Sequence, residues 1–232
     1  IRTSSTTAPT TPSVSEGLPA ALGVLGGTFD PVHVAHVRLA EEATRQLALA
    51  GVIWIPAGNP WHRRPPVASS AHRLAMVRLA AAHPGYAVDD AEILANTPSY
   101  TVPTLERLRQ RQGPGRPLVL LMGADAFLGL TTWRRWRDLF ALAHIGVASR
   151  PTFDLAPERM PPELAEEWRR RLVSHVDALP AAPAGAIATF RLDAGTVSST
   201  EVRQRLRQGA PVDALLPPSV LDYIRRHRLY SN

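Results

Sequence analysis

Two histidines stand three residues apart, at His33 and His36, directly after a glycine turn. The turn follows a short apolar run, Ala21–Leu25, that is typical of a buried strand, and it precedes Val34–Ala50, whose apolar spacing predicts an amphipathic helix. Glycines let a ligand approach the backbone closely, and a helix start offers free N–H groups and a partial positive charge to an anion. Histidines at i and i+3 share one helix face. These residues therefore predict a phosphate-binding site built from neutral or weakly cationic donors.

The composition excludes several other chemistries. All 26 basic residues are arginine, and the chain contains neither lysine nor cysteine. A P-loop needs its lysine and a Schiff-base enzyme needs a lysine amine, so both are excluded. The lack of cysteine excludes disulfides and thiolate nucleophiles and is compatible with a cytoplasmic protein. The net charge of +6 could attract a nucleotide, but the few aromatic residues give no support for a nucleic-acid partner.

The length and composition predict one domain with a tail. Of the 232 residues, 45% are hydrophobic, which suits a single globular domain. Residues 1–20 are rich in Thr, Ser and Pro and are expected to form a disordered tail, so the domain is expected to span residues 21–232. No apolar run approaches the about 18 residues that cross a bilayer, and no membrane association is expected.

Strand and helix signals alternate along the rest of the chain. This alternation predicts an α/β fold, with a doubly wound, mostly parallel sheet and helices on both faces. Ligands of such sheets bind beyond the carboxyl ends of the strands. The expected strands are Ala21–Leu25, Val52–Pro56, Tyr86–Val88, Leu118–Met122, Ile145–Ser149 and Ile187–Leu192. The expected helices are Val34–Ala50, Ser70–Ala82, Thr101–Arg111, Ala124–Leu130, Trp133–Ala143, Pro161–Val173, Ser199–Gln208 and Pro218–Arg228.

Six ordered segments of the chain resemble the motifs of the HxGH nucleotidyltransferases, and among these the bacterial nicotinate-nucleotide adenylyltransferases. The first segment is Gly26–His36, and together the six cover the whole expected domain. The other five are Pro56–Arg63, His72–Met76, Ser99–Leu105, Gly123–Phe127 followed by Trp133, and Val197–Arg203.

The resemblance implies a Rossmann-like fold and a specific reaction. The family transfers the adenylyl group of ATP to nicotinate mononucleotide, which gives deamido-NAD, a step of NAD biosynthesis, and releases pyrophosphate. The acceptor phosphate is already an anion and can attack the α-phosphorus directly, so the protein needs only to position the substrates and stabilise charge. Magnesium is expected to arrive with ATP, held mostly by phosphates and water. A homo-oligomer is left open.

The resemblance also assigns roles to residues. His33, His36 and Arg203 are expected to stabilise the ATP phosphates. The ATP-binding set adds the backbone wall of Gly26, Gly27, Thr28 and Phe29 and the helix start of Ser198, Ser199 and Thr200. The pyridine-nucleotide set comprises Tyr100 and Thr101, whose amides would receive the carboxylate, Trp133, whose ring would stack on the base, Asp125, which would bind a ribose hydroxyl, and the basic loop residues His62 and Arg63.

Some positions remain ambiguous or depart from the family pattern. Asp30 could serve only as a helix cap, and Arg73 could serve only to support a loop. The neighbours of Arg73 on the same helix, Leu74, Val77 and Leu79, are expected in the core, as is Trp136. Ala35 replaces the glycine usual between the two histidines, so a methyl group could crowd the adenine. Pro103 replaces an Asp often found there, in a helical turn that accepts proline.

Three other functions remain open at this point. A sister enzyme could act on nicotinamide mononucleotide or phosphopantetheine, although the Tyr100 and Trp133 segments favour a pyridine acceptor. A fragment of a class I aminoacyl-tRNA synthetase would share the histidine motif, but its second signature requires lysine. A nucleotide sensor without turnover would bind ATP and release no pyrophosphate.

Overall fold

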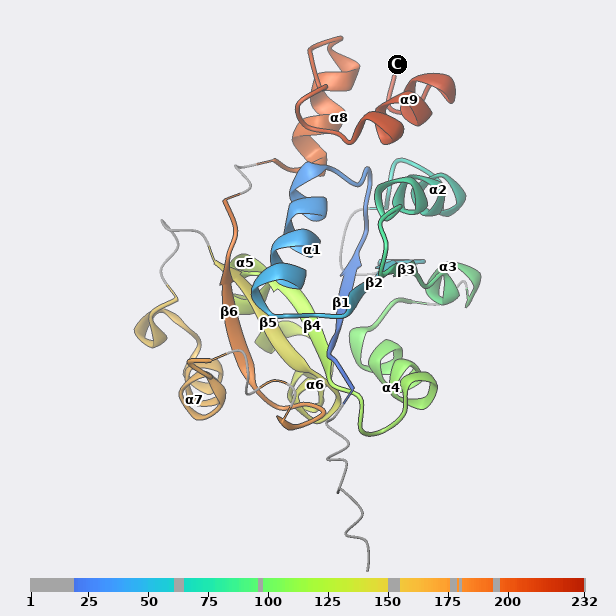
Figure 1. Ribbon diagram of the computed structural model, residues 1–232. Coiled ribbons are helices and arrows are strands. Elements are labelled where there is room, and N and C mark those ends of the chain that lie inside the picture. The colour runs from blue at the N-terminus through green and yellow to red at the C-terminus, as the bar shows by residue number, and fades with distance from the viewer. Residues whose placement is uncertain are drawn as a thin grey trace, which may run out of the picture.

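Six strands form one parallel sheet in the computed structural model, which describes residues 19–60, 65–95, 98–149, 155–175, 179, 181–193 and 197–231. The strand order is β3-β2-β1-β4-β5-β6 (Figure 1). The strands are β1 (Leu22–Gly27), β2 (Gly51–Pro56), β3 (Tyr86–Val88), β4 (Leu118–Gly123), β5 (His144–Ser149) and β6 (Ile187–Arg191). The order reverses direction between β1 and β4, and such a switch point opens a crevice at the carboxyl ends of the strands.

Helices cover both faces of this sheet. They are α1 (Val34–Gln46), α2 (Ser70–Ala80), α3 (Ala91–Ala95), α4 (Thr101–Gln112), α5 (Ala124–Leu128), α6 (Leu139–Leu142), α7 (Pro162–Arg171), α8 (Ser199–Arg207) and α9 (Pro218–Arg226). Short 3-10 turns lie at Leu130–Thr132, Trp136–Asp138 and Pro157–Arg159. Within the described ranges, every helix is too short or too polar to span a lipid bilayer.

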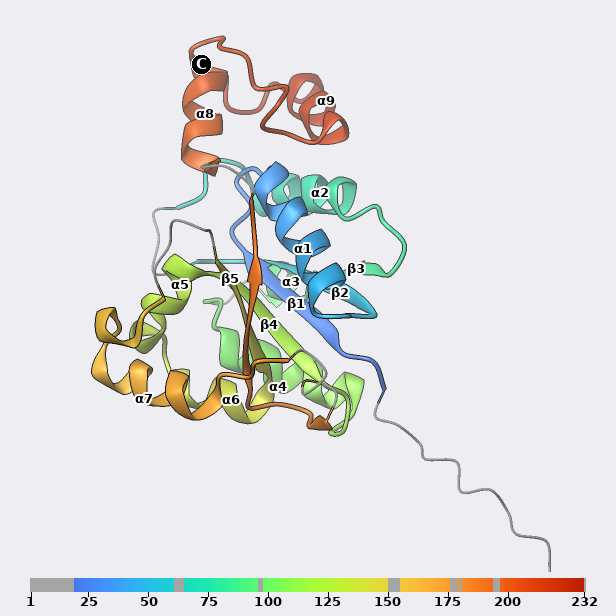
Figure 2. The same cartoon turned by 60° about the vertical axis from the view of Figure 1, so that its left-hand side comes forward.

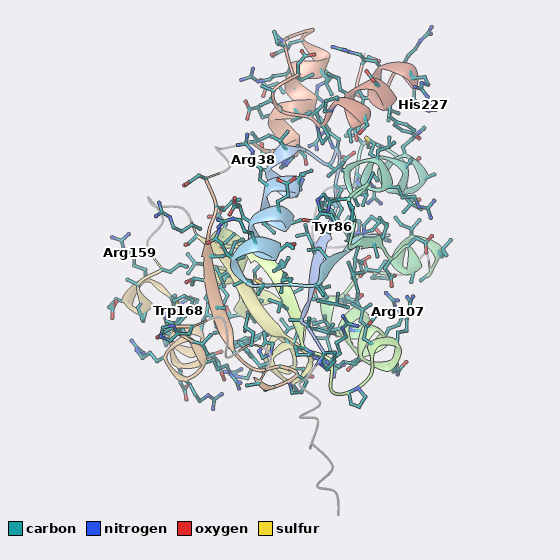
Figure 3. All side chains as sticks on the ribbon, in the orientation of Figure 1. Arg38, Tyr86, Arg107, Arg159, Trp168 and His227 are labelled. Atoms are coloured by element: carbon teal, nitrogen blue, oxygen red, sulfur yellow. The ribbon has the colours of Figure 1, made fainter. Side chains whose placement is uncertain are left out.

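Side chains alternate between two core layers, as the period of a strand requires. In β2, Val52 and Trp54 pack with α1 and α2, whereas Ile53 and Ile55 pack with α4 to α7 on the other face. Figure 3 shows Trp168 of this second layer on α7. Because both faces of β2 are buried, the strand reads as an unbroken apolar run. The predicted doubly wound α/β architecture is confirmed.

The helices α8 and α9 form a cap beyond the carboxyl ends of the strands (Figures 1 and 2). Their apolar residues Val202, Val220 and Ile224 join the core layer of α1 and α2. The backbone N–H of Val34, the first residue of α1, donates to the carbonyl of Leu215 in the connection between α8 and α9, at 3.0 Å. The cap therefore lies directly against the β1–α1 loop.

The structure agrees with the predicted strands but differs from two of the predicted helices. The predicted helix Trp133–Ala143 is wrong, because Arg135 adopts a left-handed φ of 59° and splits this segment into a 3-10 turn and α6. The predicted Val34–Ala50 helix is also too long. It ends at Gln46, before Ala48 at φ 50°.

Other expectations of the sequence concern α3, the core and the tail. The helix α3 was not among the helices predicted from the sequence. Trp136 and Val77 are buried as expected, but Leu79 is exposed. The tail boundary stays a prediction, since residues 1–18 lie outside the described part.

The start of β2 requires a glycine for steric reasons. A Cβ atom on Gly51 would lie 1.9 Å from the carbonyl oxygen of Gly85, which precedes β3. Gly51→Ala must therefore push β2 and β3 apart, and we expect it to lower the free energy of unfolding by about 1–3 kcal/mol in urea titrations. Gly115→Ala, whose Cβ would meet nothing within 4 Å, is the control. Equal unfolding free energies for the two variants would contradict this account.

Candidate functional site

The β1–α1 loop begins at the sheet edge with two glycines of different character. A Cβ on Gly26 would meet nothing within 4 Å, so this backbone faces open space. A Cβ on Gly27 would lie 2.8 Å from the ring of Phe29. Phe29 is buried at a left-handed φ of 50°, which is uncommon for a residue other than glycine, and its ring packs against Trp54 and His36. The packing of the Phe29 ring therefore fixes the close turn of this loop, and Gly26 lies where the loop backbone faces open space.

His33 and His36 stack face to face at the start of α1. Their ring centroids are 3.7 Å apart. His33 is the N-cap residue, with an extended φ of −140°, so it stands just before the helix, and the stacked rings lie on the same side as predicted. The backbone N–H of His33 donates to Nδ1 of His36 at 3.2 Å. Neutral His36 therefore carries its proton on Nε2.

His33 is neutral at physiological pH. Its side chain is only 5% exposed, and burial lowers its pKa from the usual 6.5 to about 4. Its Nδ1 atom is buried and has no hydrogen-bond partner among the residues that the structure describes. His33 can thus act as a neutral dipole but not as a cation.

Asp30 is a buried carboxylate that several elements share. It accepts hydrogen bonds from the backbone N–H groups of Val67 at 2.8 Å and Ala68 at 3.0 Å, and from the Tyr230 hydroxyl at 2.8 Å. The Arg203 guanidinium lies 3.6 Å from its Oδ2. Asp30 does not cap α1, since His33 holds that position. The carboxylate instead connects the β1–α1 loop with three other parts of the chain, which are the loop after β2, the helix α8 and the segment after α9.

The start of α8 docks onto the same loop. Ser198 is its N-cap and accepts from the N–H of Glu201 at 3.2 Å, and Ser199 donates its hydroxyl to the carbonyl of Pro31 at 2.9 Å. Arg203 donates through Nη1 to the carbonyl of Asp30, and through Nη2 to the Thr200 hydroxyl at 3.3 Å. The start of α8 therefore lies against the short loop that leads into α1.

Arg73 joins the β1–α1 loop to the loop after β2. It lies on α2, is 1% exposed, and donates to the carbonyls of Thr28 at 2.8 Å, Ala57 at 2.6 Å and Gly58 at 3.0 Å. The backbone N–H of Ala57 also donates to the carbonyl of Gly27 at 2.9 Å. These contacts show that Arg73 supports two loops, and a supporting role was the alternative that the sequence left open for it.

The start of α4, where Tyr100 and Thr101 lie, adjoins the loop after β2. The N–H of Gly58 donates to the Ser99 hydroxyl at 3.0 Å, which brings the start of α4 beside the loop after β2. The Arg134 guanidinium lies over the Tyr100 ring, 5.1 Å from its centroid, and Trp133, which precedes Arg134, is half-buried.

The remaining predicted residues differ in what the structure says of them. Thr101 is the first residue of α4, which continues without a break through Pro103. Asp125 lies exposed in the first turn of α5, at the carboxyl end of β4 and so at the same sheet edge as β1. Ala35 packs against the core layer of α1. His62 and Arg63 lie outside the described residues.

Comparison with known proteins places this geometry in a family. The cytidylyltransferase-like family model matches residues 24–205. A probable nicotinate-nucleotide adenylyltransferase of Dechloromonas aromatica is 52% identical, over 91% of this chain and 98% of that protein. One from Chromobacterium violaceum is 48% identical, over 91% and 99%. The chain belongs to the nicotinate-nucleotide adenylyltransferase family.

The solved structures agree in fold with this adenylyltransferase family member. Nicotinic acid mononucleotide adenylyltransferase of Plasmodium falciparum, complexed with NaAD, aligns with a TM-score of 0.69 at 15% identity, over 91% of this chain and 98% of that one. At this identity the likeness concerns the fold alone. It confirms the Rossmann-like arrangement that the motifs predicted.

The sequence does not indicate the three hydrogen-bond donors of the Asp30 carboxylate. Tyr230 stands far from every motif, and nothing in its surroundings in the sequence indicates that it reaches Asp30. Asp30 belongs to the first motif, yet its partners Val67 and Ala68 donate through backbone N–H groups that leave no trace in side-chain types.

The lowered pKa of His33 makes stability depend on pH. Between about pH 6.5 and 4 the unfolded chain binds a proton that the folded protein does not, so stability falls as the pH is lowered. We expect the ligand-free protein to lose up to about 2 kcal/mol between pH 6.5 and 5 by urea unfolding. His33→Asn should flatten this dependence, and His227→Asn should not. An identical pH profile for His33→Asn and the unsubstituted protein would refute the assignment.

Proposed function

We propose that this chain transfers the adenylyl group of ATP to nicotinate mononucleotide, with deamido-NAD and pyrophosphate as products, as a step of NAD biosynthesis. One observation carries the assignment of the ATP side: the N-termini of α1 and α8, together with Arg203, surround the β1–α1 loop. Helix N-termini bind anions through free N–H groups and a partial positive charge. A triphosphate has the charge and length to bridge two such termini.

Each residue on the ATP side has a donor to offer. Neutral His36 carries its proton on Nε2, because its Nδ1 accepts from the N–H of His33, and we assign this Nε2–H to a phosphate oxygen. The Ser198 hydroxyl accepts from the N–H of Glu201 and the Thr200 hydroxyl accepts from Arg203, and we assign the protons of both hydroxyls to phosphate oxygens. Ser199 already gives its proton to Pro31, and we assign its contribution to its backbone N–H. Gly26, Gly27, Thr28 and Phe29 provide the close backbone wall.

The chemistry needs position and charge rather than a protein nucleophile. The acceptor phosphate attacks the α-phosphorus in line, a new P–O bond forms, and the bond to the β-phosphate oxygen breaks as pyrophosphate leaves with its electron pair. His33, His36 and Arg203 would stabilise the charge that builds on the transferred and departing phosphates. The neutral state of His33 suits a dipolar role beside the cationic Arg203.

Magnesium belongs to the nucleotide in this proposal. Among the described residues, no three His, Asp or Glu side chains are grouped so as to hold a metal ion. We therefore treat Mg²⁺ as part of the MgATP substrate, held mostly by phosphate oxygens and water. We place the reaction in the cytoplasm, and we assign no nucleic-acid or membrane partner. A homo-oligomer is compatible with the proposal.

The pyridine nucleotide is assigned to the start of α4. The N–H groups of Thr101 and Val102 precede the first hydrogen bonds of this helix, and Pro103 has none, so two donors face the acceptor carboxylate. Tyr100 flanks them, and Trp133 would stack on the base. Asp125 would accept a ribose hydroxyl. His62 and Arg63 are proposed to meet the substrate phosphates.

A pyrophosphate-release assay tests the function directly. With MgATP as donor, nicotinate mononucleotide should give the highest kcat/KM, ahead of nicotinamide mononucleotide and phosphopantetheine. The highest rate with nicotinamide mononucleotide would instead assign the amide as acceptor. Saturable ATP binding without release with any acceptor would identify a nucleotide sensor.

Removing the presented donor of His36 should lower turnover. We expect His36→Ala to reduce kcat by on the order of 10²–10³, as loss of one preorganised donor does. His72→Ala is the matched control, because His72 lies on α2 and contacts Tyr223 outside the loop. Unchanged turnover in His36→Ala would sink the assignment.

Trp133 should act on one substrate only. Stacking on a base contributes ~1–3 kcal/mol, so Trp133→Ala should raise KM for nicotinate mononucleotide by about tenfold and leave KM for ATP nearly unchanged. Trp136→Phe, in the core, provides the control for general destabilisation. Equal changes in both KM values for Trp133→Ala would indicate a packing role.

A further inference from the structure

The Tyr230 hydroxyl reaches the catalytic loop from 200 positions away in the sequence, at Asp30. Tyr230 is buried in the core layer shared with α1 and α9, and its hydroxyl donates to Asp30 Oδ1 at 2.8 Å. This bond links the segment after α9 with the residues between the two glycines and His33.

The backbone around Tyr230 is fixed in an uncommon form. Arg228 and Tyr230 adopt left-handed φ values of 51° and 63°, and the N–H of Leu229 donates to the carbonyl of Ile224 at 3.0 Å, which turns the chain back after α9. Two residues other than glycine in this region require support from their surroundings. The buried ring and the Asp30 bond supply that support.

Asp30 also contacts Arg203, the cation assigned to the triphosphate. The Arg203 guanidinium donates a hydrogen bond to the carbonyl of Asp30 and forms an ion pair with its carboxylate, with Nη1 3.6 Å from Oδ2, beyond hydrogen-bond distance. Two backbone N–H groups and the Tyr230 hydroxyl donate the hydrogen bonds to the carboxylate. A carboxylate with fewer donors would attract the guanidinium more strongly, because buried charges require compensation.

We propose that Tyr230 is a positioning residue for ATP, which acts by occupying the Asp30 carboxylate and so leaves the Arg203 guanidinium oriented toward the triphosphate. The inference rests on the role of Arg203 in the proposed function. Without the hydroxyl, Oδ1 of Asp30 keeps only the N–H of Ala68, and the guanidinium closes on the carboxylate. Tyr230 stays protonated as a donor, since burial and the adjacent Asp30 raise its pKa well above the ordinary value.

The experiment compares two tyrosines of the same cap. Tyr230→Phe keeps the buried ring and removes the hydroxyl. Tyr223→Phe, the control, removes a hydroxyl that bonds Nδ1 of His72 at 3.0 Å, near His227 at the outer side of α9 (Figure 3). We expect Tyr230→Phe to raise KM for ATP by about five- to tenfold, the size of one lost hydrogen bond to a charged group. KM for nicotinate mononucleotide should change less than twofold, and Tyr223→Phe should change neither constant.

The split between the two KM values separates positioning from folding. Partial unfolding lowers the amount of active enzyme and so kcat, but it leaves both KM values unchanged. Equal KM values for Tyr230→Phe and the unsubstituted enzyme, or equal increases for both substrates, would overturn the inference.

Arg203→Ala keeps the two proposals distinguishable. If Arg203→Ala raises KM for ATP while Tyr230→Phe does not, only the role of Tyr230 fails. If Arg203→Ala changes neither kcat nor KM, the proposed role of Arg203 fails, and the inference fails with it. In the double variant, Tyr230→Phe should add nothing to the KM of Arg203→Ala, because its effect passes through the missing guanidinium. An additive increase would contradict that coupling.

Discussion

The buried carboxylate of Asp30 is the constraint on which the site depends. A carboxylate removed from water destabilises a fold unless donors surround it. Its donors come from the loop after β2 and from the segment after α9, with the Arg203 cation beside it. Separate parts of the chain must therefore assemble around the β1–α1 loop, and the same assembly brings the start of α8 next to the start of α1.

A second buried polar group connects this assembly with the region that is predicted to bind the acceptor nucleotide. Arg73 binds carbonyls of the β1–α1 loop and of the loop after β2, and the latter loop binds Ser99 beside α4. The two predicted substrate regions are thus connected by hydrogen bonds to main-chain atoms. Such a connection fixes their separation, which matters because the reaction depends on position more than on a protein nucleophile.

The sequence was informative where periodicity and motif coincide. The predicted strand Val52–Pro56 matched the structure within one residue, since a buried parallel strand reads as a short apolar run. It failed at Trp133–Ala143, where Arg135 in a left-handed conformation breaks a periodic segment, and at Tyr230, whose partner is set only by the tertiary fold. Motifs thus identified the residues that are predicted to face substrates. The contacts that support these residues are set by the tertiary fold and could not be predicted from the sequence.

A crystal structure with a non-hydrolysable ATP analogue and Mg²⁺ is the most direct test of this account. The account predicts the triphosphate between the first turns of α1 and α8, within hydrogen-bond distance of His36 Nε2 and the Arg203 guanidinium, with the bond between Tyr230 and Asp30 retained. A triphosphate bound elsewhere, or an Arg203 guanidinium hydrogen-bonded to the Asp30 carboxylate while the nucleotide is bound, would contradict it.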